Sequence, residues 1–252
     1  MNYGENYGDG RITGTLYIID SISTLSYCSL MARMARAVAP GVPHHVTQRG
    51  NRRQKVFFED DDYTVYKELL AEGCKMAGVA VWAYCLMPNH VHLILVPGDR
   101  DGLRAALSEA HRRYTRLING RKGWTGYLWQ GRFSSFAMDD AYLLACARYV
   151  EQNPVRARLV ERARDWRWSS ARAHLSGRDD GFVKVKPLLD LVDDWPAFLG
   201  ERLTEETLEP IRSGEHTGRP LGSPAFVKLL ERRLGRTLAR QKPGPKPKSD
   251  EE

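Results

Sequence analysis

The sequence contains few cysteines and no long apolar stretch. Its 252 residues include four cysteines, and no two of them stand in a C-x-x-C pair. This spacing argues against a cysteine zinc site and a disulfide framework, and it is typical of the reducing cytoplasm. No apolar run approaches the roughly 20 residues that a membrane-spanning helix needs. We therefore expect a cytoplasmic protein without a membrane partner.

The two ends of the chain differ in composition from its centre. Residues 1–30 lack the basic start and the small-residue cleavage site of a secretory signal. Because Met31 and Met34 precede a sequence with a cleaner start, we expect translation to begin at one of them and residues 1–30 to be a weakly ordered extension. Residues 176–240 are expected to form a helical C-terminal extension, with a possible role in DNA binding. The basic and acidic tail, 241–252, is predicted to be disordered.

Acidic residues are too few to balance the basic ones, and the imbalance is local. The net charge is +7, and residues 101–175 alone contain 14 Lys and Arg against 7 Asp and Glu. The whole excess therefore lies in this stretch, where aromatic residues are interleaved. A concentrated basic surface of this kind favours a polyanionic partner such as nucleic acid. The alternative is a set of arginine-rich helices that are merely solvated.

Hydrophobic periodicity and turn residues predict the order β-α-β-β-α-β-α within residues 38–175. The first six elements are those of an α+β, ferredoxin-like or RRM-like split β-α-β fold, with an antiparallel sheet and helices on one face. The other face of the sheet is expected to be open. Strands are expected at 44–49, 79–87, 90–96 and 133–138, and helices at 61–78, 102–120, 139–153, near 187–192 and at 223–238.

Two histidines interrupt a strand that otherwise has the sequence of a buried one. In PNHVHLILVP, residues 88–97, the period of two places His90 and His92 on one face and the apolar Val91 and Leu93 on the other. Two imidazoles spaced roughly 6–7 Å along a strand can converge on one metal ion. A strand with polar residues on its wet side explains the pair equally well.

A second pair lies on the helix predicted at 139–153. Tyr149 and Asn153 are four residues apart and share a helical face. Taken singly, each residue is better explained as core or as a helix stop before Pro154. Together with the strand histidines, an amide oxygen can complete a divalent-metal site, and a phenol one turn away can attack a phosphorus atom. Because the pKa of a phenol is near 10, phosphotyrosine is a good leaving group and the attack is reversible, as strand transfer requires.

Four motifs in this order resemble the REP-associated tyrosine transposases, single-tyrosine members of the HUH endonuclease superfamily. They are MPNHVHLIL, YLWQGRF, RYVEQNPVRARLV and DWRWSSARAHL, and the resemblance extends over roughly residues 38–240. H-x-H alone is a weak signal, whereas H-x-H with Y-x-x-x-N-P at this separation is specific. The family often has glycine where Arg158 stands here, a departure that leaves the catalytic set intact.

The resemblance implies a role for each residue of these pairs. His90 and His92 are the metal ligands, Asn153 is the third ligand, and Tyr149 is the nucleophile. Members of this family cut and rejoin single-stranded DNA at imperfect hairpins, through a 5′-phosphotyrosine. The ligand types admit Mg²⁺, Mn²⁺ or Zn²⁺, and the resemblance favours Mg²⁺ or Mn²⁺. A monomer and a homodimer both remain open, and a nucleoid-associated location follows from the DNA partner.

Other tyrosines and histidines compete with these assignments. Tyr142 lies on nearly the same helix face as Tyr149, but farther from Asn153. His44 and His45 are adjacent on a strand, so they point to opposite faces and cannot both line one site. We interpret them as structural, with one DNA contact at most. Tyr114 lies on the second predicted helix, and His111 and His174 are expected to be surface residues rather than ligands.

Candidate DNA contacts are a basic turn after the first strand, arginines flanking the site, and tryptophans that can stack on unpaired bases. Two other functions remain. A non-catalytic nucleic-acid binder on an RRM-like sheet would show Phe or Tyr where this strand has histidines. A metal-dependent nuclease without a covalent step would need a carboxylate to position water, and none stands beside H-x-H. The candidate DNA contacts are Arg49, Asn51, Arg52, Arg53, Arg132, Arg148, Arg156, Trp166 and Trp168.

Overall fold

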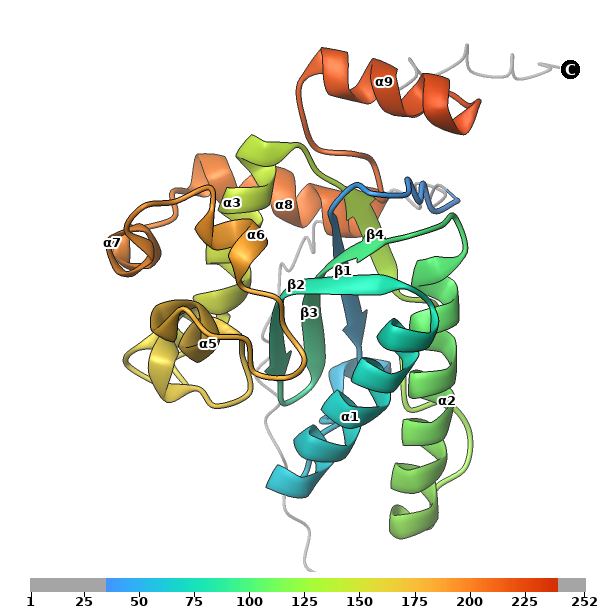
Figure 1. Ribbon diagram of the computed structural model, residues 1–252. Coiled ribbons are helices and arrows are strands. Elements are labelled where there is room, and N and C mark those ends of the chain that lie inside the picture. Colours follow the sequence, from blue (N-terminus) through green and yellow to red (C-terminus); the bar gives the residue numbers. More distant parts are fainter. Residues whose placement is uncertain (1–34, 240–252) are drawn as a thin grey trace, which may run out of the picture. The chain divides into compact units, whose positions relative to one another are not determined.

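Four strands form one antiparallel sheet with the order β2-β3-β1-β4 in the computed structural model, which describes residues 35–239 (Figure 1). The predicted extension 1–30 and tail 241–252 lie outside the described residues. The strand order and the β-α-β-β-α-β sequence of elements confirm the predicted fold class. The strands are β1 His44–Arg49, β2 Val79–Met87, β3 His90–Pro97 and β4 Ser134–Ala137.

The helices occur where the chain shows helical periodicity and capping residues, and the extension adds several that the sequence did not predict. Asp139 accepts a hydrogen bond from the Tyr142 N–H and thereby caps α3. The main helices are α1 Asp60–Met76, α2 Gly102–Lys122, α3 Asp140–Glu151, α8 Glu205–Thr217 and α9 Pro224–Leu234. Short ones are α4 Asn153–Arg156, α5 Ala171–Ser176, α6 Lys186–Leu189 and α7 Trp195–Gly200, with 3₁₀ turns η1 Asn51–Arg53 and η2 Ala163–Asp165.

One face of the sheet packs against α1 and α2. Val91, Leu93 and Leu95 of β3 are fully buried on this side, as the period of two predicts. They meet Leu70 of α1 and Leu107 of α2 in one apolar cluster. Burying a side chain of this size contributes about 2 kcal/mol, so this cluster is the main source of the fold's stability.

The opposite face, which carries the histidines, is covered rather than open as the sequence predicted. Ile94 of β3 and Phe136 of β4 are buried against residues of α3 and α8, including Val150 and Ile211. In Figure 1, α3 and α8 lie on the side of the sheet away from α1 and α2. The prediction is wrong because apolar residues of the C-terminal extension are buried against this face.

Several helices differ from those predicted. Helix α2 continues past Gly120 and ends at Gly123, which takes the left-handed φ of 64°. Helix α3 ends at Glu151, because Pro154 has no N–H to donate to Val150, and a separate turn, α4, starts at Asn153. Helix α8, which begins after the capping residue Thr204, was not predicted, because Pro210 lies inside it and proline usually interrupts a helix.

Arg158 has a φ of 56°, in the left-handed region that only glycine enters without strain. This conformation gives a physical reason for the glycine that the resembling family often has there. Arg52 and Arg53 also have left-handed φ values, 52° and 60°, in the predicted basic turn. The turn is therefore a strained one held by its surroundings, among them a hydrogen bond from Asn89 Nδ2 to the Arg53 carbonyl at 3.1 Å.

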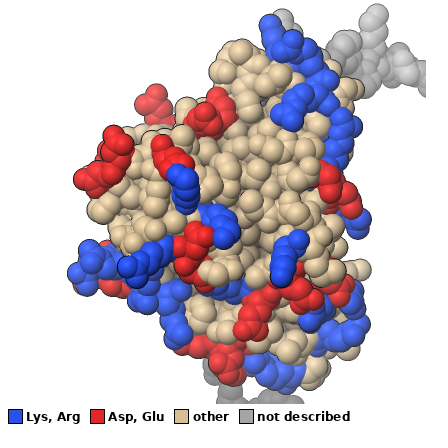
Figure 2. All heavy atoms as spheres, viewed as in Figure 1, with Lys and Arg blue, Asp and Glu red and all other residues tan. Residues whose placement is uncertain are grey.

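Charged side chains on the face drawn in Figure 2 are interspersed, with a run of basic ones at the top over α9. The last turn of α9 contains two basic residues, Arg232 and Arg233. On this face the basic excess therefore does not form one continuous patch. Within residues 35–239, no helix combines the length and apolar character needed to cross a membrane.

Stability should fall on acidification because of His44. Its Nδ1 lies 2.7 Å from the Val42 carbonyl and its Nε2 accepts from the Ala39 N–H, so the neutral ring uses both nitrogens. Burial lowers the pKa of His44 from 6.5 to about 4. Between these values the unfolded chain binds the proton first, so the free energy of unfolding should drop by up to about 3 kcal/mol as the pH falls.

Denaturant titrations across this pH range measure the effect. The His44→Gln variant should show a smaller loss on acidification than the wild type, while the exposed control His216→Gln should behave as the wild type does. Equal pH slopes for the wild type and His44→Gln would contradict this role.

Candidate active site

A cavity of about 690 Å³ opens where β1, β3, α3 and α8 meet. His90 and His92 of β3 and Tyr149 of α3 line it, so the structure brings together the strand pair and the predicted nucleophile. Glu215 of α8 also lines it, and four arginines surround these groups. The arginines are Arg49, Arg53, Arg132 and Arg212.

The histidine rings are held by neighbours that set which nitrogen is free. His90 Nδ1 lies 2.6 Å from Asn89 Oδ1, and because an amide oxygen accepts, this contact places the proton on Nδ1 and leaves Nε2 as a ligand atom. His92 Nδ1 lies 3.0 Å from His45 Nε2, and the two rings are stacked with centroids 5.2 Å apart. His45 thus orients His92 from the neighbouring strand.

Tyr149 lies against these rings. Its ring centroid is 5.4 Å from that of His92 and 5.9 Å from that of His45, both in edge-on contact. Arg156 covers the ring, with its guanidinium carbon 4.0 Å from the centroid, and donates to the Tyr149 carbonyl at 2.9 Å. The Tyr149 side chain is therefore fixed, with its hydroxyl within hydrogen-bonding reach of Glu215.

Glu215 is the functional candidate that sequence reasoning missed. Its Oε1 lies 3.6 Å from His92 Nδ1 and 3.9 Å from His45 Nδ1. Gly214 allows this approach, because a Cβ there would lie 2.9 Å from the Phe136 ring, and Ser134 Oγ donates to the Glu215 carbonyl. The Thr204 cap and the spacing from Leu208 to Ile211 are the sequence signals that indicate helix α8. No pattern in the sequence around Glu215, however, indicates that its side chain faces β3.

Burial away from water shifts the pKa values of the titratable groups in this site. Burial lowers the pKa of His90 to about 4 and that of His92 well below its usual range, and neighbouring cations act in the same direction. Burial raises the pKa of Glu215 to about 7 and that of Tyr149 well above its usual range. Both imidazoles are therefore neutral, which is the form that binds metal.

The chemistry of these donors fits a divalent cation. Among residues 35–239, His45, His92 and Glu215 form a group whose ligand atoms lie within 4.8 Å of one another. Glu215 Oε1 and His45 Nδ1 are buried without a hydrogen-bond partner. A buried carboxylate oxygen without a donor is costly, and a cation beside it would remove that cost.

Residues 40–153 match the sequence model of the family described as IS200-like transposases. This part of the chain is therefore similar to the IS200-like transposases. The matched segment contains the strand histidines, the nucleophile candidate and Asn153, and it ends before the extension that supplies Glu215.

Individual relatives match this chain at low sequence identity. A Haemophilus influenzae protein named for REP-associated tyrosine transposases is 26% identical over 116 residues, which cover 42% of this chain and 66% of that protein. The match thus spans slightly less than two thirds of that relative. A REP-associated tyrosine transposase solved with a REP hairpin is 22% identical at a TM-score of 0.48, covering 69% of this chain and 99% of that one. A Deinococcus radiodurans R1 structure assigned to a transposase is 21% identical at a TM-score of 0.35, covering 48% and 96%.

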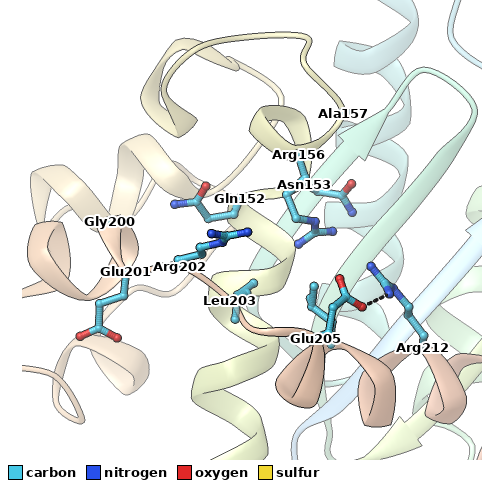
Figure 3. Close-up of a pocket in the computed structure, with 11 residues that line it drawn as sticks. Gln152, Asn153, Arg156, Ala157, Gly200, Glu201, Arg202, Leu203, Glu205 and Arg212 are labelled. Atoms are coloured by element: carbon cyan, nitrogen blue, oxygen red, sulfur yellow. Dashed lines mark hydrogen bonds and ion pairs between the residues drawn. The ribbon is translucent and has the colours of Figure 1, made fainter.

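Not every predicted site residue lines the cavity that contains Tyr149. Asn153 lines a neighbouring cavity instead (Figure 3), because α3 ends before it. Arg148 pairs with Glu201 at 2.5 Å, which attaches α7 to α3.

Trp166 donates its Nε1 to the Leu86 carbonyl at 3.0 Å, and Trp168 stacks on Tyr63 with centroids 4.8 Å apart. Asn51 and Arg52 lie in the turn before Arg53, which does line the site.

The competing residues occupy other places. Tyr142 of α3 is half-buried and outside the cavity, and Tyr114 is buried and donates to the Val56 carbonyl at 2.7 Å. His44 is structural, as predicted. His174 was predicted to be at the surface, but it is 2% exposed and bonds Glu151, a partner that the sequence pattern does not reveal. His111, also predicted at the surface, is partly buried and bonds the Tyr66 hydroxyl at 2.9 Å.

Proposed function

We propose that this protein is a metal-dependent transposase that cuts and rejoins single-stranded DNA at hairpins through a 5′-phosphotyrosine on Tyr149. The observation that carries the proposal is the position of Tyr149, in edge-on contact with His92 and in one cavity with His90. The match to the IS200-like transposase model and the name of the H. influenzae relative, a REP-associated tyrosine transposase, support DNA as the substrate.

Residues of this chain can carry out DNA binding, cleavage and rejoining. Arg49, Arg53 and Arg132 line the cavity, where guanidinium groups can hold DNA phosphates. The Tyr149 oxygen attacks the phosphorus, the bond to the DNA 3′ oxygen breaks, and the phenol proton is lost as the 3′-hydroxyl gains one. Attack by that hydroxyl on the phosphotyrosine reverses the step and rejoins DNA. A bound Mg²⁺ or Mn²⁺ supplies charge stabilisation at the non-bridging oxygen.

Covalent capture tests the proposal. Hairpin oligonucleotides taken from repeats that flank the gene, labelled on the side that becomes 5′ at the cut, are incubated with the protein and Mn²⁺. A labelled band that migrates with the protein on a denaturing gel is the expected result. Cleavage without such a band would overturn the tyrosine mechanism and favour the hydrolytic alternative. One observation supports that alternative, since Glu215 places a carboxylate in the cavity, where it could position water.

For the metal, we propose His90, His92 and Glu215 as the protein ligands. Asn153 remains the sequence-based prediction for the third ligand, and the two assignments make different predictions. Glu215→Gln should weaken Mn²⁺ binding by about 10- to 100-fold, because it removes the charged ligand, whereas Asn153→Ala should leave it nearly unchanged. Isothermal titration of each protein with Mn²⁺ alone, without DNA, measures the affinities. The opposite pattern would restore Asn153 as the ligand.

A further inference from the structure

The basic turn that follows β1, residues 50–56, packs directly on the corner between β2 and β3, Pro88–Asn89. The Gly50 N–H donates to the Asn89 carbonyl at 2.8 Å. Glycine is required at this position, because a Cβ there would overlap the Gln54 carbonyl oxygen and would lie 3.4 Å from the Asn89 carbonyl oxygen. The turn and the corner are therefore in contact through their backbones, and a movement of one would displace the other.

The side-chain amide of Asn89 connects two residues that line the cavity containing Tyr149. Its Oδ1 accepts from His90 Nδ1 at 2.6 Å, and its Nδ2 donates to the Arg53 carbonyl at 3.1 Å. The first contact leaves His90 Nε2 available as a ligand atom, and the second holds the backbone of Arg53, whose side chain lines the same cavity. An amide can make both contacts at once, because it carries an acceptor oxygen and a donor nitrogen side by side.

The backbone of Arg53 needs this support. Arg52 and Arg53 both have left-handed φ values, which an L-residue keeps only where its surroundings impose them. Both side chains are exposed, so burial of apolar surface does not hold the turn. Hydrogen bonds hold it instead, through the Arg53 N–H to the Gly50 carbonyl at 3.0 Å and through the Asn89 amide. Loss of the amide would free the Arg53 carbonyl and let the guanidinium leave the cavity.

We propose that Asn89 is a positioning residue that holds a metal ligand, His90, and a phosphate-binding arginine, Arg53, in one fixed arrangement. The proposal rests on the proposed function, because it takes His90 as a ligand and Arg53 as a contact to DNA phosphate. Asn89 acts through these two residues. Loss of its side chain should therefore weaken metal binding without DNA present, and DNA binding without metal present.

Isothermal titration with Mn²⁺ alone tests the contact with His90. Asn89→Ala should weaken Mn²⁺ binding about tenfold, as the loss of a group that orients a metal ligand does. Asn89→Asp should restore the affinity, because a carboxylate oxygen accepts from His90 Nδ1 as the amide oxygen does. The matched control Gln54→Ala removes an amide from the same turn that does not line the cavity, and it should leave the affinity unchanged.

Binding of a hairpin oligonucleotide in EDTA, measured by fluorescence anisotropy, tests the contact with Arg53. Asn89→Ala should weaken this binding about fivefold, roughly the effect of one net hydrogen bond. In an Arg53→Gln background the same substitution should have no further effect, because the arginine through which Asn89 acts is gone. A thermal melt establishes that each variant folds. Asn89→Ser takes the place of Asn89→Ala if that variant does not fold, since one hydroxyl group cannot contact both partners.

Three outcomes would overturn the proposal. They are an unchanged Mn²⁺ affinity in Asn89→Ala, an equal loss of that affinity in Asn89→Ala and Asn89→Asp, and additive effects of Asn89→Ala and Arg53→Gln on DNA binding. The covalent assay, run in parallel, separates this proposal from the proposed function. A wild type that forms no adduct, with the expected binding results for the variants, would contradict the tyrosine mechanism while the role of Asn89 stands. Adduct formation with unchanged binding in Asn89→Ala would contradict only the role of Asn89.

Discussion

Tyr149→Phe should abolish the labelled protein–DNA band and lower cleavage by about 10³-fold or more, since phenylalanine has no oxygen to attack phosphorus. The substitution removes one hydroxyl and retains the ring on which Arg156 stacks, so the cavity should keep its shape. The change is therefore chemical rather than structural. A denaturing gel with labelled hairpin DNA and Mn²⁺, and a thermal melt of each protein, measure the two effects.

Tyr142 provides the matched control. It lies on the same helix, is half-buried, and does not line the cavity. Tyr142→Phe should form the adduct at the wild-type rate. If Tyr149→Phe kept cutting at that rate without an adduct, the protein would be a hydrolase. If Tyr142→Phe lost the adduct while Tyr149→Phe kept it, the nucleophile would be Tyr142.

Glu151→Ala should cost about 3–5 kcal/mol of unfolding free energy, the largest effect on stability that we expect. Glu151 is fully buried and accepts from Ser170 Oγ at 2.5 Å and from Trp195 Nε1 at 3.2 Å. His174 Nδ1 lies 2.6 Å from the same carboxylate. One side chain thus attaches α5 and α7 to α3. Its removal leaves His174 Nδ1 and Trp195 Nε1 buried without an acceptor, while Ser170 Oγ retains the Tyr84 carbonyl at 3.3 Å.

A thermal or denaturant unfolding series measures this effect. The midpoint should fall by about 10 °C for a chain of this size, while the exposed control Glu161→Ala should stay within about 0.5 kcal/mol of the wild type. Glu151→Gln should lie between them, because an amide keeps one acceptor oxygen. An unchanged midpoint for Glu151→Ala would show that the extension packs on α3 without this network.

Local periodicity was sufficient to predict the fold and part of the site. The alternation in β3 placed Val91 and Leu93 in the core and His92 on the other face, since a strand repeats every two residues whatever surrounds it. Helical spacing likewise located Tyr149 on α3. These features depend on neighbours in sequence, so they can be predicted without knowledge of the fold.

The choice of distant residues that join the site depends instead on how the elements pack together. The β1–β3 register pairs Thr47 with His92 and so makes His45 a diagonal neighbour of that histidine. Glu215 reaches the same place because Gly214 lets α8 approach Phe136, and Asn153 turns to the neighbouring cavity because Pro154 interrupts the helix. Such contacts depend on how whole helices and strands pack together. The burial of apolar surface sets the position of each helix, and that position decides which polar side chains can meet.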